Sequence, residues 1–166
     1  MHTFTLVFLT ALALTTLIQI WLATRHIRHI RAHQNTVPEK FSSQINLADH
    51  QKAADYTCAK TRTGYPGVVL QVALLLIFTL GGGLNALNSF WANWLGDPLA
   101  HGMALIISTF LLMGIAEVPL SYYRTFVIEE QYGFNKMTRA MFFTDLIKQS
   151  LLGLLLGAPL LFCVLW

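Results

Sequence analysis

Residues 4–23 read FTLVFLTALALTTLIQIWLA, a run of twenty residues without a charged side chain. An α-helix rises about 1.5 Å per residue, so this run would be about 30 Å long, which matches the hydrocarbon core of a bilayer. Its basic residues come after it, beginning at Arg25, whereas a secretory signal carries them before the apolar run. We therefore interpret residues 4–23 as a membrane-spanning helix and not as a cleaved signal.

Three further apolar runs have the length of a span. The overall composition, 55% hydrophobic and 11% charged residues, is too apolar for an ordinary soluble domain. The glycines at 81–83 either let a neighbouring helix or a ligand approach closely, or loosen the helix that holds them, and we favour close helix packing. The sequence predicts an all-α, multi-pass transmembrane protein with four spans, at residues 4–23, 68–87, 103–120 and 142–166.

The charges predict an orientation. All eleven Lys and Arg residues lie in two stretches, 25–62 and 124–148. Short loops rich in positive charge stay in the cytoplasm, so we expect both stretches inside and the N-terminus outside, in a bacterial inner membrane. Acidic residues are mixed with these basic ones, which flank apolar runs. This pattern favours contact with the lipid bilayer over binding of nucleic acid.

The first inner connection contains a predicted cytoplasmic helix. Asn46 is a suitable N-cap, with Asp49 three residues later, and helix-forming residues continue to Arg62. Gly64 and Pro66 follow and are typical of a helix end. The helix is therefore expected to lead into the second span.

Motifs in both inner connections carry a family resemblance. They resemble the N-terminal membrane region of the type I CAAX prenyl endopeptidases, over essentially the whole chain. The resemblance implies a membrane zinc metalloprotease whose helices enclose a chamber, with the catalytic HExxH helix on a later part of the parent protein. The motifs are Pro38 with Phe41, Lys52-Ala53-Ala54-Asp55-Tyr56-Thr57, Tyr123-x-Thr125-Phe126-x-Ile128-Glu129 and Gly133-Phe134-Asn135-Lys136-x-Thr138.

This chain itself lacks the protease motif. None of its six histidines is followed by Glu and a second His in the HExxH spacing, so we assign no catalytic and no metal-binding residue. His26, His29 and His33 would share one side of a helix, but the Arg residues between them favour a basic segment on lipid headgroups over a zinc site. We expect the catalytic zinc domain to be absent from residues 1–166, zinc to belong to the full-length parent, and the chain alone to be inactive.

Two sets of residues are candidates for a functional role. Glu117 is an acidic residue in an apolar run, and it either lines a polar cavity, pairs with Arg124 or contacts interfacial water. The second set is expected to form a docking surface for the catalytic domain on the cytoplasmic side, because a turn at Gly133 and several large apolar groups would otherwise be left in water. Its candidate docking and structural residues are Lys52, Asp55, Tyr56, Tyr123, Phe126, Glu129, Gly133, Phe134 and Asn135.

Three functions remain open from the sequence. We favour the membrane scaffold of a CAAX-type zinc metalloendopeptidase, which helps to form the intramembrane chamber and docks the catalytic domain. The alternatives are a standalone interaction or regulatory membrane protein derived from that scaffold, and a small transporter component. No polar tail follows Trp166. Both a natural end and a fragment of a longer chain that re-enters the membrane are compatible with that pattern.

Overall fold

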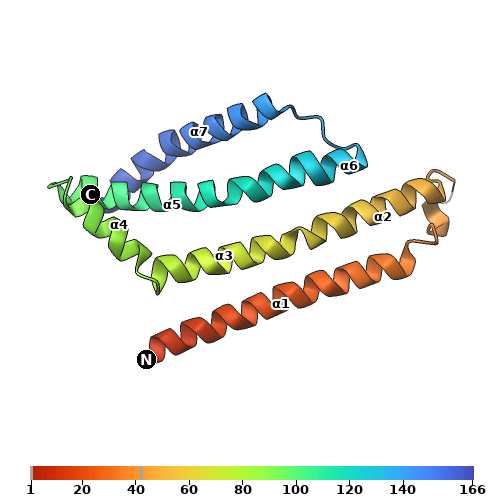
Figure 1. Cartoon of the computed structure of the whole chain (residues 1–166), viewed down its shortest axis with the longest axis horizontal. Helices are drawn as coiled ribbons and strands as arrows, with labels where there is room; N and C mark the ends of the chain where they lie inside the picture. The colour runs from red at the N-terminus through yellow and green to blue at the C-terminus, as the bar shows by residue number, and fades with distance from the viewer. Residues whose placement is uncertain (1, 42) are drawn as a thin grey trace. The chain divides into compact units, whose positions relative to one another are not determined.

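The computed structural model describes residues 2–41 and 43–166, and every regular element in these ranges is a helix (Figure 1). The predicted all-α fold class is confirmed. The helices are α1 (Thr3–His33), η1 (Glu39–Phe41), α2 (Leu47–Arg62), α3 (Gly64–Thr79), α4 (Gly83–Ala92), α5 (Pro98–Tyr123), the π-helix η2 (Arg124–Glu129), α6 (Glu130–Tyr132) and α7 (Arg139–Leu165).

Four helical stretches among the described residues are long and apolar enough to cross a membrane: Thr3–His33, Leu47–Thr79, Pro98–Tyr132 and Arg139–Leu165. A helix suits a lipid environment because it pairs most of its backbone groups within the segment. Most large apolar side chains are exposed, and in the described ranges the buried apolar ones are only Ile27, Ala54, Cys58, Ile128 and Phe142. Such a distribution suits helices whose apolar surface meets lipid.

The second predicted span differs from the structure. We expected one helix over residues 68–87, whereas α3 ends at Thr79 and α4 begins at Gly83. Gly82 adopts φ +79°, and a Cβ at Gly81 would lie 2.8 Å from the carbonyl oxygen of Ile77. Only glycine suits both positions, because the first is left-handed and the second is crowded by backbone. The glycines therefore interrupt the helix, which is the second of the two interpretations of the sequence.

The chain divides into two compact units. Unit 1 consists of the described residues of Met1–Val72 together with Tyr123–Asn135, and unit 2 consists of Ala73–Tyr122 together with Lys136–Trp166. In unit 1, α1 runs beside α2 (Figure 1). The amide of Asp49 donates to Asn46 Oδ1 at 2.7 Å, which confirms the predicted N-cap of α2. The helix restarts at Gly64 after a single turn residue, so Gly64 and Pro66 open α3 instead of ending the helical stretch.

Unit 2 contains an apolar groove between α5 and α7. Its volume is about 590 Å³, and its lining includes Gly114 from α5 with Gly153 and Gly157 from α7. At one end of the helix pair, the ring centroid of Tyr122 lies 5.7 Å from that of Phe142. A Cβ added at any of these three glycines would meet no atom within 4 Å, so α5 and α7 stay apart along the groove.

Candidate functional site

The candidate site begins with a π-helix. Residues Arg124–Glu129 continue α5 with one extra residue per turn, and α6 follows at once. π-Helical segments are rare, cost regular hydrogen bonding and occur often at functional sites. This segment belongs to unit 1 and packs against α2.

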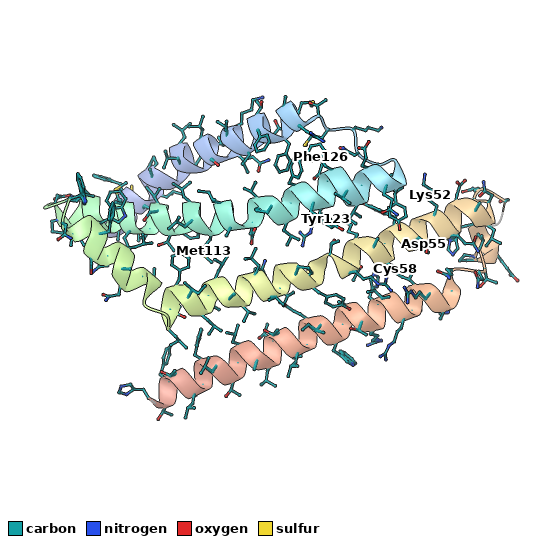
Figure 2. All side chains as sticks on the ribbon, in the orientation of Figure 1. Lys52, Asp55, Cys58, Met113, Tyr123 and Phe126 are labelled. Atoms are coloured by element: carbon teal, nitrogen blue, oxygen red, sulfur yellow. The ribbon has the colours of Figure 1, made fainter. Side chains whose placement is uncertain are left out.

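Helix α2 uses two opposite sides for its contacts. Ala54 and Cys58 are one turn apart and buried, at 8% and 5% exposure, on one side. Lys52 and Tyr56 are also one turn apart, on roughly the other side of the helix. Because α2 contacts both α1 and η2, it lies between them. Figure 2 marks Lys52 and Cys58 along α2.

An aromatic cluster joins α2 to the segment after η2. We define it as Tyr56, Tyr132 and Phe134. The ring centroid of Tyr56 lies 4.6 Å from that of Phe134 and 5.5 Å from that of Tyr132. Lys52 Nζ lies 5.6 Å from the Phe134 centroid, and Lys60 Nζ lies at the same distance from the Tyr56 centroid. Aromatic rings at these distances attract each other, and an ammonium group is attracted to a ring face. The cluster therefore holds the segment with Tyr132 and Phe134 against α2.

A glycine turn orients Phe134 in this cluster. Gly133 adopts φ +76° and ends α6, as expected for a helix C-terminus. The amides of Phe134 and Asn135 both donate to the carbonyl oxygen of Glu129, at 2.8 and 3.2 Å. The Asn135 side chain, which we expected to bond backbone, donates to Glu130 Oε2 at 2.8 Å. The turn thus has a fixed backbone path.

Arg124 makes a long-range contact within unit 1. Its Nη2 donates to the backbone carbonyl oxygen of Thr63 at 3.2 Å, at the break between α2 and α3. A charged donor satisfies a helix-end carbonyl there, which couples the start of η2 to the end of α2. The sequence suggested Glu117 as a partner for Arg124 and offered no signal for Thr63, which lies 61 residues away along the chain.

The predicted site residues fall into three groups. The structure brings Lys52, Tyr56, Glu129, Gly133, Phe134 and Asn135 together in the turn and aromatic cluster. Figure 2 labels Asp55 on α2 and shows Tyr123 and Phe126 where α5 passes into η2, outside the aromatic cluster. Glu117 is exposed on α5 and does not line the apolar groove of unit 2. Sequence reasoning missed Lys60 and the Arg124 contact.

No metal site forms among residues 2–41 and 43–166. No three His, Cys, Asp or Glu side chains there lie close enough together to hold a metal ion. The rings of His29 and His33 are 4.3 Å apart, but His33 Nδ1 lies 2.8 Å from the backbone carbonyl of His29, with which it bonds. The zinc implied by the resemblance therefore has no fitting ligand set in the described part of the chain.

Comparisons with known proteins agree with the sequence resemblance. A family model described as "CAAX prenyl protease N-terminal, five membrane helices" matches residues 26–166, whereas the described residues hold four candidate spans. The CAAX prenyl protease 1 homolog of Caenorhabditis elegans is 31% identical over 141 residues, which cover 84% of this chain and 31% of the relative. The probable CAAX prenyl protease 1 of Schizosaccharomyces pombe is 40% identical over 134 residues, covering 72% and 28%.

A solved structure shares the fold. The crystal structure of S. mikatae Ste24p matches 98% of this chain and 39% of its own length, with a TM-score of 0.86 at 22% sequence identity. The chain spans 31% of the length of the C. elegans relative and 28% of the S. pombe relative.

Proposed function

Because the chain belongs to the CAAX prenyl protease N-terminal family, we propose that it is the membrane-embedded scaffold of a CAAX-type zinc metalloendopeptidase. In this proposal its helices help to form the intramembrane chamber, and residues 123–135 with α2 dock the catalytic part of the protein. The chain is a multi-pass membrane region of this protease family. The scaffold and docking roles are our inference.

One observation supports the docking role: residues 123–135 are held against α2 and still expose large apolar side chains. The aromatic cluster, the Gly133 turn and the Arg124 contact hold residues 123–135 against α2. Yet Tyr123 remains 46% exposed, Val127 42% and Phe134 49%. In our proposal this segment lies outside the bilayer, where exposed apolar groups are typical of a surface that another protein part covers.

Catalysis requires ligands that the described residues do not bring together. In our proposal the zinc, its ligands and the general base come from another part of a longer parent protein. Zinc hydrolysis needs protein ligands and an activated water in one site. Those groups would lie on the part of the protein that docks on this surface.

We test the docking role in the full-length parent protein. Phe134→Ala and Gly133→Val should each lower cleavage of a prenylated peptide sharply at equal protein level. The first removes the ring from the cluster, and the second forces a β-branched residue to φ +76°. Phe162→Ala is a matched control, because Phe162 has a similar exposure of 47% but lies in the α7 span. Equal activity of all three variants and wild type would show that the connection is only a tether.

The proposed orientation places the N-terminus outside and both basic stretches in the cytoplasm of a bacterium, although the relatives named above are eukaryotic. Single cysteines at His2 and Asn93 should react with an impermeant thiol reagent added outside intact cells. Cysteines at Gln34 and Gln131 should react only after permeabilisation. Labelling of the Gln34 position from outside would show that the proposed orientation is wrong.

A further inference from the structure

Helix α1 has two chemically different faces where it leaves the predicted span. Ile27 is buried, with 7% exposure, and Thr24 Oγ1 lies 3.0 Å from Tyr65 OH of α3. This face is turned toward α2 and α3. With 3.6 residues per turn, Arg25 and His29 lie on roughly the opposite side of the helix. Both are exposed.

A basic hollow lies on this second face. Its volume is about 330 Å³, and its lining residues are Leu22, Arg25, His26 and His29. The Arg25 guanidinium lies 5.6 Å from the ring centroid of Trp21. Within the described residues, no carboxylate lines the hollow. The hollow is therefore lined by one guanidinium and two imidazoles, which can all donate hydrogen bonds. Leu22 supplies its apolar wall.

The hollow continues an apolar stripe of the span. Leu14, Ile18 and Leu22 follow one another at intervals of four residues along α1, and their exposures are 55%, 54% and 48%. Side chains at this spacing share one face of a helix. Trp21 beside the hollow is of the type that concentrates at headgroup depth. With Trp21 at headgroup depth, the apolar stripe would face the lipid tails, and Arg25, His26 and His29 would face the phosphates.

We propose that this face of α1 is a binding site for an anionic phospholipid. The phosphate occupies the hollow, where Arg25, His26 and His29 donate hydrogen bonds to its oxygens. One acyl chain lies along Leu14, Ile18 and Leu22. Guanidinium groups pair strongly with phosphate. The apolar stripe favours a phospholipid over a free phosphate ion, because only the lipid has an acyl chain to contact it. The site is distinct from the docking surface on α2 and needs no catalytic partner.

The test uses Trp21 as the reporter in the full chain, purified and reconstituted into vesicles. Brominated phosphatidylglycerol and brominated phosphatidylcholine quench tryptophan on contact, so the ratio of their quenching measures the preference for the anionic lipid near Trp21. Arg25→Gln is compared with Arg28→Gln, which removes the same charge from the same helix but does not line the hollow. The other tryptophans are changed to Phe: Trp91, Trp94 and Trp166.

The wild-type reporter should prefer phosphatidylglycerol. Arg25→Gln should reduce the preference at least about tenfold, because it removes a charged hydrogen-bond donor to the phosphate as well as a charge. Arg28→Gln should reduce it at most about fivefold, which is the effect of one cation at the membrane surface. Equal losses in both variants, or no preference in the wild type, would mean that the basic segment acts only through its diffuse charge. Inorganic phosphate, added to the wild type at millimolar concentration, should not displace the lipid. Displacement would show that the hollow recognises phosphate alone.

Discussion

Truncation of Ile27 should expose the buried Cys58 thiol to modification. Ile27 on α1 is 7% exposed, and Cys58 on α2 is 5% exposed. Because α1 and α2 pack against each other within unit 1, we infer that both buried side chains lie between these helices. A change that weakens this packing should let α1 separate from α2 locally. The thiol reacts only in the separated state, because a buried sulfur is shielded from reagent.

The magnitude follows from the atoms removed. Ile27→Ala deletes three carbon groups from a site that is almost fully buried, at about 0.8 kcal/mol each, or about 2.4 kcal/mol. Since 1.4 kcal/mol is a factor of ten, the opening equilibrium should rise about 50-fold. Ile27→Val deletes one group, which corresponds to about fourfold. When closing is faster than labelling, the labelling rate follows this equilibrium.

The assay is the rate of Cys58 labelling by a thiol reagent in detergent micelles. A Cys163→Ser background removes the second, exposed thiol. Ile18→Ala is the matched control, because it makes the same substitution on α1 at a side chain that is 54% exposed, and it should change the rate less than about twofold. A rate that is unchanged in Ile27→Ala, or raised equally by Ile18→Ala, would refute the assignment of Cys58 to the α1–α2 contact.

Two further predictions concern the N-cap of α2 and the aromatic cluster. Asn46→Ala removes the acceptor at 2.7 Å from the Asp49 amide and should destabilise unit 1 by about 1 kcal/mol. The measurement is the thermal midpoint in micelles, and Asn46→Ser, which keeps a capping oxygen, should retain most of the stability. A double-mutant cycle with Tyr56→Leu and Phe134→Leu should give a coupling of about 0.5–1.5 kcal/mol for the rings 4.6 Å apart, and additive effects would show that they do not interact.

Part of the site could be read from local sequence because local chemistry decides it. The Asn46 N-cap follows from a side chain that reaches an amide three residues on, and Gly133 is one of the few residue types that adopt φ +76° without strain. The three consecutive glycines at 81–83 were ambiguous from sequence alone. Both close packing and a helix break use glycine. The structure shows the break, with Gly82 at φ +79° and Gly81 close to the Ile77 carbonyl oxygen.

The sequence by itself determined the membrane class and the all-helical fold, since an apolar helix in lipid pairs most of its own backbone groups and needs no distant partner. Tertiary structure alone decided which residues of the candidate site meet. The bond of Arg124 to Thr63 and the contact of Tyr56 with Phe134 join positions more than 60 residues apart along the chain. Such pairs depend on how two helices and a turn pack against one another. The spacing of residues within one segment does not predict that packing.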